Sequence, residues 1–210
     1  MNTYIVFGLV MLVIVVVSLI ASGMLAASFN ERAKADLGRA LAPLAGQVDG
    51  TADIESASIS GRYRGHIATA AMVSAPGGMG RQFEVKLVDG AGGKPWTHLT
   101  TRPKDDVGPI EHRFDGDANV EIDLTKHLRG PMEALLPFPG WFQLKYDPVT
   151  GEVRLNRTMQ SRKDIPTSER FAAYLETVHT AAVANRAAQA PDPATRGVAG
   201  LVPGAGGTAS

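Results

Sequence analysis

The chain has 210 residues, its 21 Lys and Arg are balanced by 21 Asp and Glu, and it contains no cysteine. A net charge of zero gives no long-range attraction to nucleic acid. The lack of thiols excludes disulfides, Cys-ligated zinc, iron–sulfur clusters and a cysteine nucleophile. The length accommodates one domain of ordinary size, and the residue pattern predicts four segments: 1–29, 30–50, 51–189 and 190–210.

The first segment predicts a transmembrane anchor. Residues 4–29 carry no charged side chain, and residues 5–20 are almost entirely Ile, Val, Leu, Phe and Met. About 20 apolar residues span a bilayer as a helix. A cleaved signal peptide is the alternative, because Ala21-Ser22-Gly23 resembles a cleavage site. Signal peptides, however, have a basic start and an apolar core of about 7–15 residues, and here only three uncharged residues precede a longer core.

The flanking charges predict the orientation of this anchor. No Lys or Arg precedes the apolar run, whereas Arg32, Lys34 and Arg39 follow it closely. Since basic residues remain on the cytoplasmic side, we expect a single-pass protein of the bacterial inner membrane, with its N-terminus outside and its domain in the cytoplasm.

Small residues gather in the second half of the apolar run. They are Ser18, Ser22, Gly23, Ala26 and Ala27. Small residues at this spacing let transmembrane helices approach closely, which predicts packing against other integral membrane subunits. The alternative is that Ala and Ser are simply frequent near helix ends.

Residues 30–50 predict a short stalk helix. Its apolar positions recur at helical spacing, namely Leu37, Leu41, Leu44 and Val48. Pro43 should kink or end the helix near Ala42, and Asp49-Gly50 should stop it. The stripe is too short for a coiled coil, so we expect it to pack on the domain.

Residues 51–189 predict an α+β domain with a mostly antiparallel sheet. Alternation of apolar and polar residues predicts strands near 57–63, 67–73, 83–87, 96–101, 110–114, 120–124, 142–146 and 153–155. Turn signals predict three hairpins, centred on Arg64-Gly65, residues 89–93 and residues 147–151.

Two helices complete the predicted domain. A short helix is expected over 125–136, broken at Gly130-Pro131, and a long helix over 167–189, capped by Thr167 or Ser168. Phe171, Tyr174, Leu175, Val178 and Ala182 should turn one apolar face of the long helix to the sheet. The Ala-, Gly- and Pro-rich segment 190–210 is predicted to be disordered.

No catalytic or cofactor motif is complete. The segment Asp115-Gly-Asp117-Ala-Asn119 lacks the later Gly and Glu of a calcium loop, and residues 90–94 lack the spacing of a phosphate loop. His98 and His112 fall on neighbouring predicted strands, but no third metal ligand can be named. We therefore predict no cofactor and no metal.

Candidate surface contacts are Trp141, Arg154 and Arg157. The two arginines belong to the densest basic cluster, with Arg162 and Lys163, which predicts either contact with anionic lipid or a solvated strand edge. Trp141 precedes a strand whose next polar residues face outward, which favours an exposed contact residue.

These features favour an accessory or scaffolding subunit of a larger membrane complex, which acts by protein–protein contacts and binds no nucleic acid. Two alternatives remain open. One is a membrane-tethered hydrolase whose site is assembled from distant residues. The other is an envelope sensor or ligand-binding module, which requires the opposite orientation.

Overall fold

The structure is a computed structural model of the whole chain. It describes residues 3–75, 77, 80–90, 92–101, 111–135, 141–159 and 164–189. The chain divides into two compact units. Unit 1 contains residues 1–86 and 156–172, and unit 2 contains residues 87–155 and 173–210.

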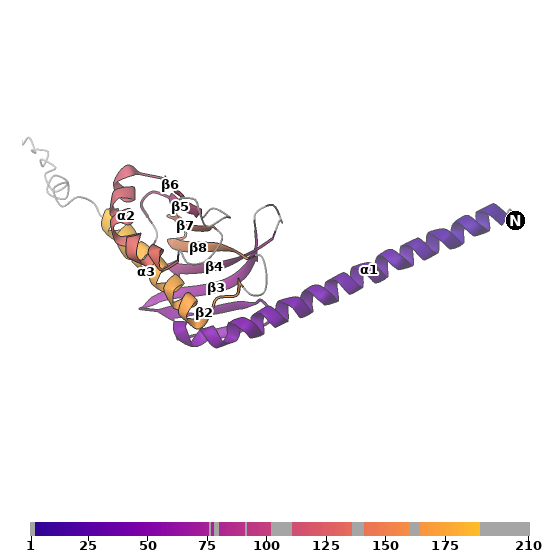
Figure 1. The fold of residues 1–210 in the computed structure, drawn as a ribbon. Coiled ribbons are helices and arrows are strands. Elements are labelled where there is room, and N and C mark those ends of the chain that lie inside the picture. The colour runs from indigo at the N-terminus through magenta and orange to yellow at the C-terminus, as the bar shows by residue number, and fades with distance from the viewer. Residues whose placement is uncertain are drawn as a thin grey trace, which may run out of the picture. The chain divides into compact units, whose positions relative to one another are not determined.

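The fold combines helices with one antiparallel sheet of eight strands, ordered β1-β2-β3-β4-β8-β7-β5-β6 (Figure 1). The strands are β1 (Thr51–Asp53), β2 (Ser58–Tyr63), β3 (His66–Ser74), β4 (Arg81–Val88), β5 (Trp96–Thr101), β6 (Glu111–Asp115), β7 (Phe142–Asp147) and β8 (Glu152–Met159). The helices are α1 (Thr3–Leu41), the 3₁₀ helix η1 (Ala42–Val48), α2 (Ala118–Glu133) and α3 (Ser168–Ala188). The predicted α+β class, the antiparallel sheet and the long C-terminal helix are confirmed.

In unit 1, the apolar segment and residues 30–41 of the predicted stalk form one continuous helix, α1. The α-helical geometry stops at Leu41 because Pro43 cannot donate to the next turn, and η1 continues as a tighter helix. η1 ends at Asp49, whose φ of 42° is left-handed. The stripe of Leu37, Leu41, Leu44 and Val48 is buried, as predicted for a helix that packs on the domain.

The hairpin of β2 and β3 has the predicted turn. Tyr63 pairs with His66, which leaves Arg64 and Gly65 as the two turn residues. Both have positive φ, 48° and 87°, the geometry that twists a two-residue turn to match its strands. This hairpin is therefore specified locally.

The hairpin predicted around residues 89–93 is wrong. β4 and β5 are not neighbours in the sheet, since β8 and β7 lie between them in the strand order. The backbone N–H of Asp89 donates to the carbonyl of Gly151 at 2.8 Å, and that of Gly92 donates to Pro148 at 2.9 Å. The segment after β4 thus bonds to the β7–β8 turn instead of closing a hairpin of its own.

The strand predicted over 120–124 is also wrong, because these residues begin α2. Val120, Leu124, Leu128 and Met132 are buried at four-residue spacing, whereas Ile122 is 66% exposed. Apolar residues at every second position from Val120 to Leu124 are compatible with a strand or a helix. The four-residue spacing that continues to Leu128 indicates the helix. α2 also runs through Pro131, which lies in its last turn.

α3 has the predicted apolar face, since Phe171, Tyr174, Leu175, Val178 and Ala182 are all buried. The backbone N–H of Arg170 donates to Thr167 Oγ1 at 3.4 Å, which caps the helix. In unit 1, Phe171 meets Phe83 of β4 edge to face, with ring centroids 6.0 Å apart. The predicted tail, 190–210, lies outside the described residues.

Candidate functional site

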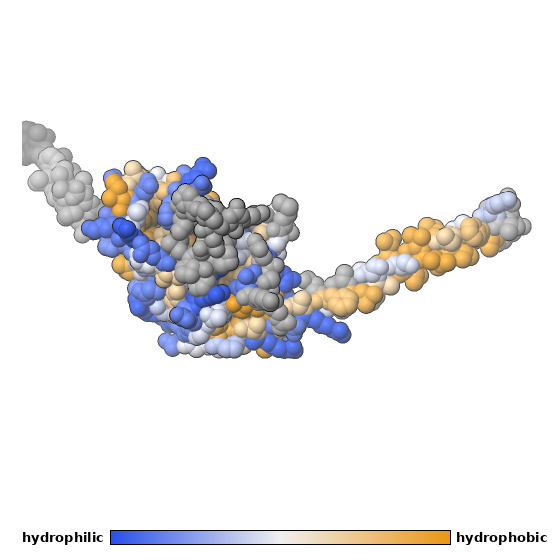
Figure 2. Space-filling view, in the orientation of Figure 1, coloured by the Kyte–Doolittle hydropathy of each residue, from blue (hydrophilic) through white to orange (hydrophobic). Residues whose placement is uncertain are grey.

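The first candidate site is the apolar part of α1. Every side chain from Val6 to Leu25 is exposed, and Figure 2 shows hydrophobic residues along this part of the helix. Residues 4–29 rise about 39 Å at 1.5 Å per residue, against a hydrocarbon thickness of about 30 Å. Within the described residues, this is the one helix long and apolar enough to cross a membrane.

The small-residue stripe lies on this exposed segment. Ser22, Gly23 and Ala27 are exposed, as is Ser18, and a Cβ added at Gly23 would meet nothing within 4 Å. The side chain of Ala26 lies outside the described residues. Packing of the stripe against another membrane helix stays a prediction.

The second candidate site is a cavity of about 470 Å³ in unit 2. Its sheet wall comes from β5 and β6, which are antiparallel with His98 opposite Phe114 and Thr100 opposite His112. The prediction that His98 and His112 lie on neighbouring strands is confirmed, and their ring centroids are 5.6 Å apart.

The helical wall of this cavity comes from α2. It contributes the apolar side chain of Met132 and the charged side chains of Glu121, Arg129 and Glu133. Arg129 Nε donates to Glu133 Oε1 at 3.2 Å, one helical turn away. The lining of the cavity therefore combines apolar and charged side chains.

His98 is the buried polar group of the cavity, with 7% of its surface exposed. Burial, together with a smaller contribution from charge repulsion by His112, lowers the pKa of His98 to about 4. The ring is therefore neutral at pH 7. A neutral imidazole both donates and accepts a hydrogen bond, so His98 can orient an uncharged polar group.

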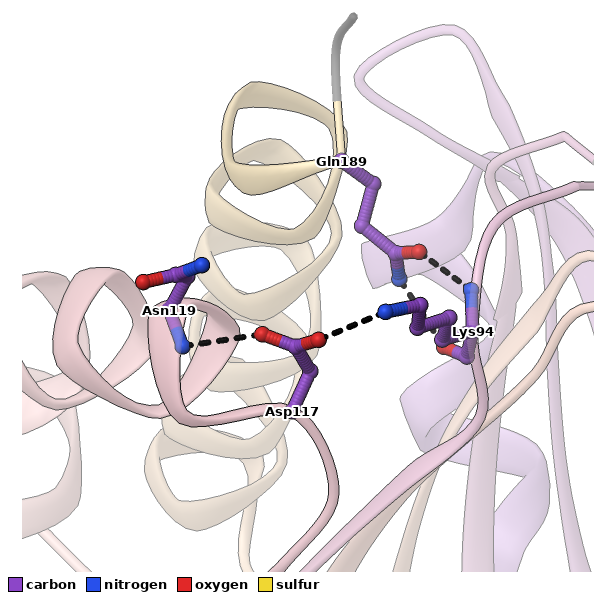
Figure 3. Close-up of polar contacts among 4 residues, drawn as sticks. All are labelled: Lys94, Asp117, Asn119 and Gln189. Carbon is purple, nitrogen blue, oxygen red and sulfur yellow. Dashed lines mark hydrogen bonds and ion pairs between the residues drawn. The ribbon is translucent and has the colours of Figure 1, made fainter.

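A polar cluster fixes the N-terminus of α2, and with it the helical wall (Figure 3). Asp117 caps the helix by accepting from the Asn119 N–H at 3.0 Å, and its other oxygen accepts from Lys94 Nζ at 2.7 Å. Gln189, just after α3, exchanges hydrogen bonds with the Lys94 backbone, and its Nε2 donates to the Lys94 carbonyl at 3.0 Å. The bond to Lys94 and the helix cap together lower the pKa of Asp117.

Trp96 ties the same cluster to the core of unit 2. Its indole Nε1 donates to Asn185 Oδ1 at 2.7 Å, and Asn185 Oδ1 also accepts from Gln189 at 2.6 Å. Trp96 stacks on Phe114 of the cavity wall, with ring centroids 6.2 Å apart. The cavity is thus built on residues that packing and hydrogen bonds hold in place.

The composition of the cavity fits a small-molecule pocket better than a metal centre. Among the described residues, no group of three or more His, Asp or Glu side chains is placed to hold a metal ion. A volume of a few hundred Å³ with a few fixed polar groups is typical of ligand sites. Of the α2 residues on this wall, Glu121 falls in the predicted strand over 120–124, whereas Arg129 and Met132 fall in the predicted helix over 125–136. For Glu121, the four-residue spacing into Leu128 is the sequence signal that indicates the helix.

The three predicted surface residues have different surroundings. Trp141 is half-buried just before β7. In unit 2, Arg154 Nε donates to Glu152 at 2.8 Å and lies 3.8 Å from Asp147. Arg157 is 7% exposed, which does not fit a surface contact. Arg162 and Lys163 lie outside the described residues.

The chain matches no protein-family model, and the comparisons with curated proteins and with solved structures also give no match. Its function is therefore argued from these sites alone.

Proposed function

We propose that this chain is a single-pass membrane protein that acts as an accessory or scaffolding subunit of a larger membrane complex. The observation that carries the proposal is the exposure of every side chain from Val6 to Leu25. Fully burying one large apolar side chain stabilises a fold by about 1.5–3 kcal/mol, and here none of the run contributes to a protein core. A bilayer supplies the apolar surroundings that this segment requires.

The rest of the proposal follows from charge and from the small residues. Basic residues after the apolar segment favour a cytoplasmic domain in a bacterial inner-membrane protein. The small-residue stripe is the surface offered to other integral membrane subunits. The domain acts by protein–protein contact, without a cofactor.

Membrane fractionation tests the anchor. The full chain should stay in the membrane pellet after alkaline carbonate washing and should enter solution only with detergent. Mild detergent should then release it together with other integral membrane proteins. Recovery in the soluble fraction, shortened at its N-terminus, would overturn the anchor, and recovery as a lone monomer would overturn the subunit role.

The orientation has its own test. Because the chain lacks cysteine, a single Val149→Cys substitution places one thiol on an exposed turn of the domain. A membrane-impermeant thiol reagent applied to intact cells should leave it unlabelled until the membrane is opened, while Asn2→Cys should be labelled at once. The reverse pattern would place the domain outside.

A ligand-binding module is the second candidate, and the cavity beside His98 supports it. Ligands of the full chain in detergent would raise its unfolding temperature, since a ligand that binds only the folded state stabilises it. Thr125→Phe should block the shift because Thr125 lines the cavity, whereas Lys126→Phe, exposed on the same helix, should preserve it. A shift that survives Thr125→Phe would exclude this cavity.

A further inference from the structure

A second, smaller cavity lies in unit 1, where α1 meets the sheet. Its volume is about 240 Å³. Lys34 and Leu37 of α1 form one side, and Met72, Ser74 and Arg81 of β3 and β4 form the other. Two cations and a hydroxyl therefore converge from three elements on one small space.

The two cations of this cavity are Lys34 and Arg81. Within the described part of the chain, neither side chain makes a hydrogen bond or lies within 4 Å of a carboxylate. Both are exposed. Other basic residues are paired, such as Arg39 with Asp36 at 3.1 Å and Lys86 with Glu84 at 3.1 Å. Positive charge is thus left available at this cavity.

Lys34 has an electrostatic influence on Asp53, whose carboxylate pKa is lowered chiefly by hydrogen bonds from Ser56 and slightly by the Lys34 charge. Asp53 Oδ1 already accepts from the backbone N–H groups of Glu55 and Ser56 at 2.9 and 3.2 Å. Asp53 does not line the cavity, and no carboxylate is among the described residues that do.

The position of Lys34 along α1 matches the depth of lipid headgroups. Lys34 lies five positions after Phe29, the last residue of the apolar segment, which corresponds to about 7.5 Å of helix. The headgroup layer of one leaflet is about 5–7 Å thick. A long lysine side chain also reaches along its helix toward phosphate.

We infer that this cavity binds the phosphate of an anionic phospholipid headgroup, with Arg81 and Lys34 as its cationic ligands and Ser74 as a hydrogen-bond donor. Arg presents a planar set of donors that suits phosphate oxygens. The inference rests on the proposed membrane anchoring. The sequence pattern predicts lipid contact at Arg154 and Arg157 as one of two alternatives, but Arg154 is paired and Arg157 is buried. The proposed contact instead uses Lys34, which follows the anchor closely, and Arg81, which the fold brings to the same cavity.

The test uses the full chain purified in a non-ionic detergent, with phosphatidylglycerol or phosphatidylcholine added and bound lipids counted by native mass spectrometry. The wild-type chain should retain phosphatidylglycerol in preference to phosphatidylcholine. Since one basic residue near anionic lipid contributes about fivefold in affinity, Lys34→Ala and Arg81→Ala should each weaken the preference about fivefold, and the double variant about 25-fold.

Two matched variants control for charge and fold. Arg39→Ala removes an exposed cation from the same helix away from the cavity and should leave the preference intact, whereas Arg81→Lys should restore part of it. Equal loss in Arg39→Ala and Arg81→Ala, with unchanged unfolding temperatures, would show a diffuse charge effect and overturn the site.

Competition with free phosphate tests whether the cavity binds a lipid or a soluble anion. Inorganic phosphate and glycerol phosphate should compete only at concentrations far above those of the lipid, because they lack acyl chains held in the bilayer. Binding of glycerol phosphate as tight as that of phosphatidylglycerol would overturn the lipid source. If carbonate-washed membranes retain the double variant and the wild type shows no lipid preference, the headgroup site is overturned but the membrane anchor is supported. If the wild type is lost from these membranes, the anchor itself is overturned.

Discussion

The two parts of α1 differ in composition and have opposite surroundings. Leu19, in the first part, is 68% exposed, while Leu41, in the second, is fully buried. Both belong to one continuous helix of 39 residues. Because the helix is the same, the difference comes from what each part can pack against.

The arrangement of apolar residues explains this difference. In 30–48 they form one stripe between charged residues, so a single protein face covers them. In 4–29 they cover the helix on all sides, and no single face of a small domain can cover such a segment. An apolar stripe between charged residues therefore marks the core part of this helix, and an apolar surface on all sides marks the part that can span a membrane.

The largest effect is expected from charges placed in the first part. Replacing Val13 and Val16 together by Arg should cost about 5–7 kcal/mol of insertion free energy, since one Arg at the helix centre costs about 3 kcal/mol. The fraction of the protein retained in carbonate-washed membranes should fall steeply, while the soluble domain keeps its circular dichroism. Val13→Ala with Val16→Ala is the matched control. Full retention of the Arg variant would remove the distinction between the two parts.

Truncating one leucine in each part of α1 tests the comparison through the stability of the folded domain. Leu41→Ala should lower the free energy of unfolding by about 2–5 kcal/mol because it empties part of a packed core. Leu19→Ala should leave that free energy unchanged, since Leu19 contacts no core. Urea unfolding of the full chain in detergent, followed by tryptophan fluorescence, measures both. Equal destabilisation would mean that residues 4–29 pack on the domain.

A pair of glycines sharpens the comparison further. A Cβ at Gly38 would lie 2.6 Å from the Cα of Ile54, a backbone atom that cannot turn aside, whereas a Cβ at Gly23 would meet nothing within 4 Å. Gly38→Ala should therefore destabilise unit 1 by about 1–3 kcal/mol. Gly23→Ala should leave its unfolding unchanged, and reduced recovery of partner proteins with Gly23→Ala would point to the small-residue stripe as their contact. A harmless Gly38→Ala would contradict the close approach of α1 to Ile54.

The features predicted correctly from the sequence are those specified by neighbouring residues. The β2–β3 turn needs only Arg64 and Gly65 to adopt positive φ, and Pro43 ends the α-helical part of α1 without help from elsewhere. His98 and His112 fall on adjacent strands because alternation continues through both segments. In each case the deciding residues lie within a few positions of one another.

The missed features depend on distant residues. β4 and β5 look like a hairpin, yet Asp89 and Gly92 bond to the β7–β8 turn some 60 residues later. Of the charged α2 residues that line the cavity, Glu121 required a helix in place of the predicted strand over 120–124, whereas Arg129 and Glu133 fall in the predicted helix. Arg81 has no sequence pattern that singles it out, and only the fold brings it to Lys34. Hydrogen bonds and packing between residues far apart in the sequence thus determine the features that the local sequence pattern does not predict.

The smallest effect is expected from His98, and it separates the domain from the anchor. The unfolded histidine has a pKa near 6.5, whereas burial lowers that of His98 to about 4. Between these values the unfolded chain binds more protons, so the contribution of neutral His98 is complete above pH 6.5 and is lost as pH falls to about 4. His98→Gln should therefore show a shallower decline in the urea midpoint from pH 7 to 4 than the wild type.

The control for this titration is His127→Gln, an exposed position on α2, which should keep the wild-type slope. Comparing variants at each pH cancels the carboxylates that also titrate in this range. The membrane-bound fraction should be the same at both ends of the range, because residues 4–29 carry no charge that acid can change. A His98→Gln slope equal to that of the wild type would mean that the imidazole is solvated in the folded chain. The cavity would then lack the buried polar group that makes it a candidate ligand site.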